Sequence, residues 1–252
     1  MVFIPESHFQ TPGCPIVMNK PYIVFFSIWM AMLSFTCKHE PRQENTVVST
    51  PSIPAKASTI PTYWEDPRVF EYGRELPRAD FKVFETEPKA LTNQYSASAY
   101  YASLNGFWKY RFFTGPDEVP AEIESTVLTN GWLEISMPGF AELKGLGKPI
   151  FKYFGLPFPL HYPNVPHDTN SVLILKKSIQ VPENWKERDV FAVFEGISTS
   201  YFLYVNGALT GYNEDTKNTS EFKINKFLKP GLNDLTLVLF RYSDGSYWET
   251  HN

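Results

Sequence analysis

The cluster Ser243-Asp244-Gly245-Ser246 contains the carboxylate with the clearest chemical potential in this chain of 252 residues. All four residues are of types that favour turns, so we expect Asp244 at the tip of a turn that follows a strand over Asn233–Phe240. A carboxylate on a tight turn can accept hydrogen bonds from hydroxyl groups and can ligate a hard cation. The alternative is that Asp244 simply makes the turn and bonds its own backbone.

The remaining titratable residues form no evident catalytic set. Glu214 and Asp215 are adjacent in a polar loop, so their side chains should diverge and should be solvated or cap turns. Further acidic residues surround Trp185 in a polar segment typical of a surface, namely Glu183, Glu187 and Asp189. A zinc site is not expected, because ligand spacing is missing among His161, His167 and His251. We therefore assign no catalytic residue.

Composition favours an all-β domain and excludes several function classes. The chain is 43% hydrophobic, which suffices for the core of one domain with appendages. An aromatic content of 16% and 21 prolines favour strands and turns over a helical bundle. The net charge of −4, without a long run of either sign, argues against a nucleic-acid partner. Cys14 and Cys37 both precede the globular part, so the fold should contain no disulfide.

Residues 1–37 indicate a leader with an export signal. Met18 and Lys20 precede the apolar stretch Pro21–Phe35, which is shorter than the ~20 residues that a membrane-spanning helix needs. Cys37 at its end makes the leader similar to a bacterial lipoprotein signal, in which this cysteine is lipidated, although Thr36 stands where a small residue is usual. We expect the true start at Met18.

Residues 38–62 are rich in Pro, Ser and Thr and show no apolar period, which predicts a disordered tether. Leader and tether together predict the cell envelope of a bacterium, either the periplasm or a lipid anchor in the outer membrane through Cys37. The alternative is a cytoplasmic protein whose leader is an artefact.

The domain itself is expected over residues 63–252 and is built from short strands. Asn206-Gly207 between Ser200–Val205 and Ala208–Tyr212 predicts a hairpin with a type I′ turn, because both central positions need positive φ. A single helical turn is expected at Pro120–Ser125, and residues 138–170, rich in Pro and Gly, should form a long irregular connection. Further strands are expected at Phe107–Phe113, Gly131–Met137, Ser171–Val181, Val190–Phe194, Ser220–Ile224 and Asn233–Phe240. About eight or nine strands without a long helix predict an all-β, two-sheet jelly-roll sandwich.

Several motifs along this domain match a known family in register. They are Phe194-Glu195-Gly196, Tyr204-Val205-Asn206-Gly207, Gly211-Tyr212-Asn213-Glu214-Asp215, Ser220-Glu221-Phe222 and Arg241-Tyr242-Ser243-Asp244-Gly245-Ser246-Tyr247. Upstream stand Trp64-Glu65-Asp66-Pro67 with Arg74 and Arg78, and Tyr101-Ala102-Ser103-Leu104-Asn105-Gly106-Phe107-Trp108. With these motifs, residues 63–249 resemble the N-terminal sugar-binding domain of glycoside hydrolase family 2, in its long-chain bacterial β-galactosidase branch.

The resemblance implies a galactose-binding-domain-like jelly roll that precedes an immunoglobulin-like domain and a catalytic (β/α)8 barrel. In that family both catalytic glutamates lie in the barrel, and the activity is hydrolysis of terminal β-D-galactosides. The resemblance also implies that Asp244 reaches into the sugar pocket of the barrel and contacts a galactosyl hydroxyl and a sodium ion. Sodium and magnesium are implied only for the full-length family, and no cofactor is expected in this chain alone. The implied partners are a β-galactoside or related carbohydrate and a barrel that is missing or separately encoded.

Two departures from the family pattern limit this inference. Where members carry an Asn that reaches into the pocket, this chain reads Met137-Pro138-Gly139, with Phe140 or Ala141 in place of the Asn. After Glu249 the acidic run of the family is replaced by Thr250-His251-Asn252. We therefore expect the N-terminal part of an exported β-galactosidase-like hydrolase, cut short by a frameshift, stop codon or gene split and inactive alone. The alternatives are a stand-alone, envelope-tethered carbohydrate-binding module and a non-enzymatic subunit that assembles with a separate barrel.

Overall fold

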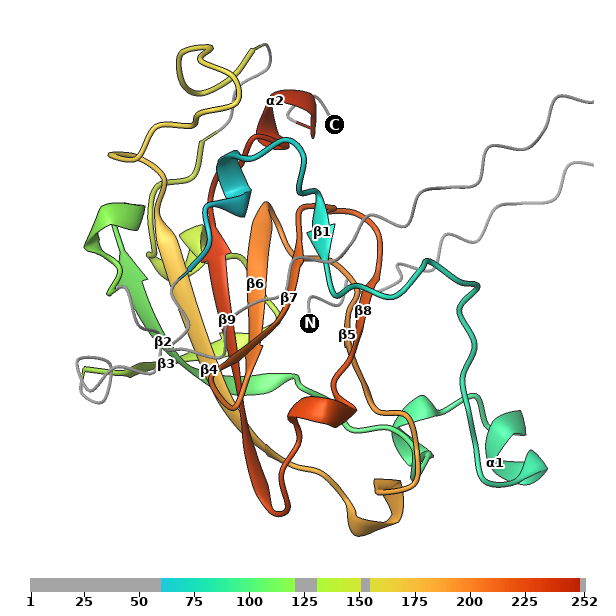
Figure 1. Ribbon diagram of the computed structural model, residues 1–252. Coiled ribbons are helices and arrows are strands. Elements are labelled where there is room, and N and C mark those ends of the chain that lie inside the picture. The colour runs from blue at the N-terminus through green and yellow to red at the C-terminus, as the bar shows by residue number, and fades with distance from the viewer. Residues whose placement is uncertain (1–59, 121–130, 151–154, 250–252) are drawn as a thin grey trace, which may run out of the picture. The chain divides into compact units, whose positions relative to one another are not determined.

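Strands dominate the part of the chain that the computed structural model describes, which comprises residues 60–120, 131–150 and 155–249. Seven strands form one antiparallel sheet: β1 (Glu71–Tyr72), β2 (Gly106–Phe113), β3 (Leu133–Met137), β4 (Val172–Gln180), β6 (Ser200–Val205), β7 (Ala208–Asn213) and β9 (Leu232–Phe240). Their order is β1-β7-β6-β9-β4-β2-β3. The strands β5 (Phe191–Phe194) and β8 (Ser220–Lys223) form a second, two-stranded antiparallel sheet, which lies beside the large one (Figure 1). The predicted all-β, two-sheet sandwich is confirmed.

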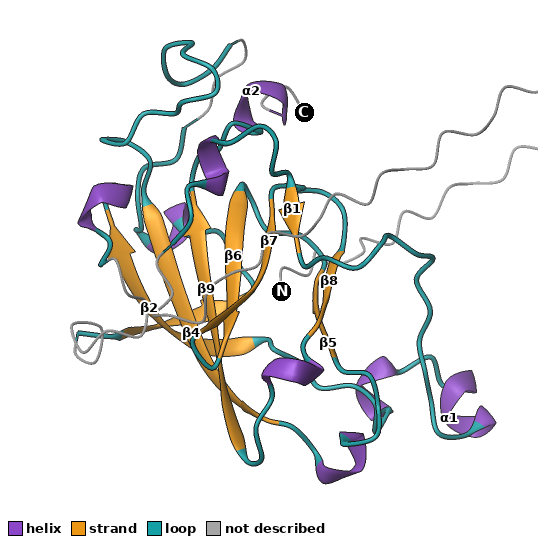
Figure 2. Cartoon of the chain, in the orientation of Figure 1, coloured by secondary structure: helices purple, strands orange, loops and turns teal. Residues whose placement is uncertain are grey.

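Helices are short throughout the described residues (Figure 2). The two α-helices are α1 (Glu87–Leu91) and α2 (Ser246–Glu249). Single 3₁₀ turns occur at Tyr63–Glu65, Tyr95–Ala97, Pro116–Glu118, Glu142–Lys144, Glu183–Trp185 and Asn225–Phe227. None of the helices described is long and apolar enough to cross a membrane. Between residues 138 and 170, the described parts contain only the turn at Glu142–Lys144, as the Pro- and Gly-rich composition predicted.

The hairpin between β6 and β7 forms where the sequence predicts it. Asn206 and Gly207 have φ values of 50° and 79°, so both central positions of the turn are left-handed, as a type I′ turn requires. β6 spans Ser200–Val205 as expected, and β7 extends one residue beyond the predicted end, to Asn213. The predicted leader, Cys37, nearly all of the tether, and the helical turn beyond Pro120 lie outside the described residues.

Both faces of the large sheet are buried along its central strands β6 and β9. Consecutive side chains of a strand point to opposite faces, so neighbouring residues belong to different core clusters. Leu173 and Leu175 of β4 belong to a first core cluster, which lies between the two sheets and includes Phe222 of β8. Val172 and Ile174 belong to a second core cluster on the other face. The second cluster also contains residues outside the strands, Trp64, Val165 and Tyr242, so segments from three parts of the chain cover that face.

Two arginines link the segment before α1 to β7, to β8 and to the loop between these strands. The Arg74 side chain is only 3% exposed, and its guanidinium donates to Asn213 Oδ1 at 3.1 Å, Asp215 Oδ2 at 3.3 Å and the Thr219 carbonyl at 3.2 Å. Arg78 forms a bidentate pair with Glu221 at 2.9 and 3.0 Å. Such forked pairs fix geometry as well as supply energy. The loop that follows β7 is therefore held firmly in place.

The close approach of the two sheets depends on Gly211 in β7. A Cβ atom at this position would lie 2.2 Å from two carbons of the Phe222 ring, which is completely buried in β8. The ring has no room to move away, so a side chain at residue 211 must displace backbone or neighbouring rings.

We therefore expect Gly211→Ala to lower the free energy of unfolding by about 1–3 kcal/mol, as overpacking of a filled core does. Gly196→Ala is the matched control, because its Cβ would meet only the Thr216 carbonyl oxygen, at an ordinary 3.5 Å. Urea denaturation of both variants, followed by circular dichroism, measures the difference. Equal stability of the two variants would contradict the packing described for Gly211.

Candidate functional site

Asp244 lies on the predicted turn, between the end of β9 and the start of α2. The turn is closed by hydrogen bonds from the Ser246 N–H to the Ser243 carbonyl at 2.9 Å and from the Tyr247 N–H to the Asp244 carbonyl at 3.2 Å. The Asp244 N–H donates to the Trp64 carbonyl at 2.9 Å. Trp64 in turn stacks on Phe240, with ring centroids 4.8 Å apart. The segment around Trp64 thus lies next to α2 and anchors the turn (Figure 1).

The side chain of Asp244 is buried, with 5% of the residue exposed. Its Oδ1 has no hydrogen-bond partner among the described residues, while the side chain is hydrogen-bonded to Glu214. Burial raises the pKa of Asp244 above its usual value, and the charges of Asp66 and Glu65 add to the rise, whereas the hydrogen bond to Glu214 opposes it. A buried acceptor without a partner costs free energy, and a ligand hydroxyl or a cation would remove that cost.

Glu214 is not solvated, contrary to the expectation from its polar surroundings in the sequence. It is only 3% exposed, and the hydroxyl of Tyr212 donates to its Oε1. The reason is that β7 runs on to Asn213, so residues 212 and 214 point to the same face and residue 215 to the other. If the in–out alternation of the predicted strand Ala208–Tyr212 is continued by two residues, it places Glu214 on the same buried face as Tyr212.

Asp215 behaves as the sequence predicted and caps a turn. Its Oδ1 accepts the backbone N–H groups of Lys217 at 3.3 Å and Asn218 at 3.1 Å. Its Oδ2 accepts hydrogen bonds from Arg74 and from the Asn218 amide. Burial acts to raise the pKa of Asp215, but these hydrogen bonds and the Arg74 charge hold it below its usual value. The predicted divergence of the two neighbouring carboxylates is confirmed.

The register of β6 explains why Glu214 and Asp244 meet although they are far apart in sequence. Tyr201 pairs with Asn213 at the end of β7, and Ser200 pairs with Phe240 at the end of β9. β7 and β9, which flank β6, therefore both end beside the first residues of β6. The residues that follow these two strands converge there. This contact is closer than the ~5–5.5 Å separation of the two catalytic carboxyl groups of a retaining glycosidase, which must hold a sugar between them.

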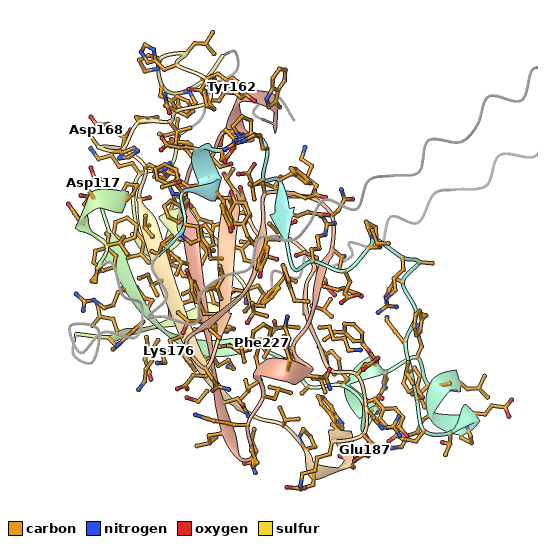
Figure 3. The ribbon with its side chains drawn as sticks, in the orientation of Figure 1. Asp117, Tyr162, Asp168, Lys176, Glu187 and Phe227 are labelled. Atoms are coloured by element: carbon orange, nitrogen blue, oxygen red, sulfur yellow. The ribbon has the colours of Figure 1, made fainter. Side chains whose placement is uncertain are left out.

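Glu65 lies in a second polar cluster, close to the Asp244 turn. His167 Nε2 is 3.2 Å from both carboxylate oxygens of Glu65, and its Nδ1 is 3.1 Å from Asp117 Oδ1; Asp117, labelled in Figure 3, follows β2. Burial acts to lower the pKa of His167, but the hydrogen bonds to both carboxylates raise it overall. Within the described ranges, no three His, Cys, Asp or Glu side chains are arranged to hold a metal ion.

The segment around Phe140 and Ala141, where the resemblance implies a missing Asn, is also connected to the end of β9. Phe140 is 66% exposed, and Ala141 packs against the first core cluster. The following loop is linked to the end of β9, because Arg241 donates to the Lys148 carbonyl at 2.7 Å and lies 3.8 Å from Glu142. Neither Phe140 nor Ala141 has a polar side chain.

Aromatic side chains surround α2 beyond the buried turn. Tyr162, labelled in Figure 3 beside this helix, contacts the rings of Tyr247 and Trp248 at centroid distances of 5.4 and 5.9 Å. Trp248 is 75% exposed and Tyr162 45% exposed. At the other end of the domain, the carboxylates predicted to form a surface are exposed, namely Glu183, Glu187 and Asp189.

We expect Asp244→Asn to stabilise the chain at neutral pH. Because folding raises the pKa of Asp244 above 3.8, the folded state binds more protons between the two values, and stability falls as pH rises through them. Asparagine carries no charge, so the variant does not lose this stability as pH rises. Its higher free energy of unfolding relative to the parent should therefore shrink below pH 3.8. Chemical denaturation of parent and variant between pH 3 and pH 8 measures the difference in their free energies of unfolding.

Asp215→Asn is the control with the opposite sign. The pKa of Asp215 is lowered on folding, so its contribution to stability is present above pH 3.8 and is lost as pH falls through its folded value. This variant should therefore be less stable than the parent at neutral pH. If both variants shift stability in the same direction, the burial described for Asp244 is wrong.

Comparison with known proteins supports the resemblance seen in the motifs. The family described as "Glycosyl hydrolases family 2, sugar binding domain" matches residues 101–252. A β-galactosidase of Psychromonas ingrahamii is 33% identical over 187 residues, which cover 74% of this chain and 18% of the relative. A β-galactosidase of Streptococcus thermophilus is 32% identical over 197 residues, which cover 75% of this chain and 19% of the relative.

Among solved structures, a β-glucuronidase from Ruminococcus gnavus aligns with a TM-score of 0.40 and 17% identity, over 55% of this chain and 21% of that one. The family match covers more than half of the chain, and the chain spans less than a fifth of the length of the β-galactosidases that it matches. The chain therefore belongs to glycoside hydrolase family 2 and contains its sugar-binding domain.

Proposed function

We propose that this chain contributes a sugar-contacting carboxylate, Asp244, to a β-galactosidase-type hydrolase whose chemistry lies in a separate barrel domain. The observation that carries the proposal is the buried Oδ1 of Asp244, which has no hydrogen-bond partner in the described residues. A galactosyl hydroxyl that donates to this oxygen would satisfy it, and a charge-assisted bond of this kind is stronger than a neutral one. Membership of the family supports the choice of carbohydrate as ligand.

The residues present fit a sodium ion in part. Asp244 offers one hard carboxylate oxygen, the kind of ligand that such a cation prefers. The described residues bring no cluster of three acidic, His or Cys side chains to it, so the other ligands would come from the sugar, water or a barrel. Bound there, the ion would add positive charge beside the sugar oxygens. We propose no residue of this chain for magnesium.

Hydrolysis of terminal β-D-galactosides is proposed for the complete protein and not for this domain alone. The task of this domain is to orient the ligand, because Asp244 is held on a turn that packs against the large sheet. Asp244 and Glu214 are in direct hydrogen-bond contact, which leaves no space between them for a glycosidic bond. This pair therefore cannot hold a sugar between its two carboxyl groups, and we propose that the groups that protonate the leaving group and attack the sugar lie in the barrel.

An envelope-tethered carbohydrate-binding module is the second candidate function. The observation that favours it is the exposed aromatic pair of Tyr162 and Trp248, since sugar rings stack on such surfaces. In this case binding would depend on Trp248 more than on Asp244. A subunit that assembles with a separately encoded barrel would instead cover this surface.

Two measurements on the purified full chain test the proposal. The chain alone should not hydrolyse a chromogenic β-galactoside, and turnover would overturn the assignment of the chemistry to another domain. Methyl β-D-galactoside, followed by NMR titration, should bind to the parent and should lose at least about tenfold in affinity in Asp244→Ala, the effect of roughly one charged hydrogen bond. Loss of affinity in Trp248→Ala with an unchanged Asp244→Ala would favour the stand-alone module.

We further propose export of the chain and lipidation of Cys37, on the basis of the leader sequence from Met18 onward. A bacterial host that expresses the full chain and is fed an alkyne-labelled fatty acid should label the parent and Cys14→Ala, but not Cys37→Ala. Equal labelling of the two variants, or none in the parent, would contradict lipidation at Cys37. Fractionation of the same cells reports whether the chain reaches the envelope.

A further inference from the structure

Tyr212 connects the Asp244 site to the most tightly packed part of the large sheet. It is completely buried in β7, and its ring centroid lies 4.5 Å from that of Phe202 and 5.5 Å from that of Tyr63. Two ring contacts leave the phenol group little freedom to turn. Because its hydroxyl donates to Oε1 of Glu214, the carboxyl group of Glu214 has a fixed support.

Glu214 lies against the turn that carries Asp244. A Cβ atom on Gly245 would lie 3.0 Å from Glu214 Oε2 and 3.3 Å from Ser243 Oγ, closer than most side chains tolerate. Glycine at position 245 therefore allows Glu214 to approach the turn. A hydrogen bond joins the side chains of Glu214 and Asp244 at this point, and because it lowers the pKa of Asp244, the carboxyl group of Glu214 donates and the carboxylate of Asp244 accepts.

The backbone alone does not set the orientation of the Asp244 carboxylate. The hydrogen bond from its N–H to the Trp64 carbonyl fixes the main chain, but two side-chain torsions remain. The hydrogen bond with Glu214 engages one side of the carboxylate, and Oδ1 is left without a partner among the described residues. Rotation of the carboxylate would break the bond to Glu214.

We propose that Glu214 is a positioning residue for Asp244. Supported by Tyr212, it holds the Asp244 carboxylate in the orientation in which Oδ1 is presented to the sugar hydroxyl. Glu214 touches Asp244 and not the ligand, so it acts through Asp244. The inference rests on the proposed role of Asp244, and it adds the residue that makes this role possible.

Asp215 supplies a matched control on the neighbouring residue. It also carries a carboxyl group, but that group points to Arg74 and Asn218, away from Asp244. Asp215→Asn keeps the size of the side chain and tests whether any change in a carboxylate of this loop affects the site. Glu214→Gln can still accept the hydrogen bond from Tyr212 and can donate an amide N–H to Asp244.

Crystal structures of the full-chain variants measure the placement of the carboxylate directly. We expect the Asp244 carboxylate to rotate or to become disordered in Glu214→Ala and to keep its parental orientation in Glu214→Gln and Asp215→Asn. Tyr212→Phe removes only the hydroxyl and should make the orientation of the Asp244 carboxylate partly disordered. This variant replaces Glu214→Ala in the test if Glu214→Ala does not fold. An unchanged Asp244 orientation in Glu214→Ala, or in Tyr212→Phe when that variant must replace it, would overturn the inference.

The affinity of the same variants for methyl β-D-galactoside tests whether the orientation of Asp244 affects binding. The affinity should fall by about tenfold in Glu214→Ala, the loss expected for roughly one charged hydrogen bond, and should stay within about twofold of the parent in Glu214→Gln and Asp215→Asn. If Asp244→Ala weakens binding and Glu214→Ala does not, the positioning role is refuted while the proposed function stands. If Asp244→Ala leaves binding unchanged, the proposed function fails, and the crystal structures still decide whether Glu214 orients Asp244.

Discussion

The antiparallel pairing of β4 with β9 is the interaction on which the rest of this domain depends. It runs over nine residue pairs, from Val172↔Phe240 to Gln180↔Leu232, in the middle of the large sheet. β9 also pairs with β6 along its other edge, so its backbone is held on both sides. The chain that leaves β9 at Arg241 consequently has a fixed starting point and direction. Trp64 packs on Phe240, the last residue of β9, and its carbonyl accepts a hydrogen bond from the Asp244 N–H. The sheet therefore fixes the position of the turn.

Carboxyl groups converge at this end of the sheet, where burial works against them. Asp244 and Glu214 are both almost inaccessible, and the charges of Glu65 and Asp66 raise the pKa of Asp244 further. A fold selected only for stability would place apolar or amide side chains here, because a buried carboxylate with an unpartnered oxygen costs free energy. Local conflicts of this kind are expected where a site must be ready for a ligand. The supporting residues, Tyr212 and Gly245, are those that make the close approach possible.

Much of the fold could be predicted from the sequence because its signals are local. The turn at Asn206-Gly207 requires positive φ at two positions, and these two residues tolerate it. The strand boundaries follow from apolar alternation and turn residues to within one or two residues. β1 could not be found in this way, because Glu71 and Tyr72 become a strand only through pairing with Asn213 and Tyr212 of β7. The unequal sizes of the two sheets depend on such pairings as well, and composition carries no information about them.

The sequence by itself determined that this chain is an all-β member of glycoside hydrolase family 2 with Asp244 on a turn, since motifs and turn chemistry are properties of adjacent residues. Only the tertiary structure decided that Glu214 is buried and bonded to Asp244. The two residues lie beyond the ends of β7 and β9, which flank β6 in the sheet. Their contact follows from the register of β6 with both neighbours, in which Tyr201 pairs with Asn213 and Ser200 with Phe240. Strand order and register are set by long-range packing, so residues distant in sequence meet for reasons that no local pattern contains.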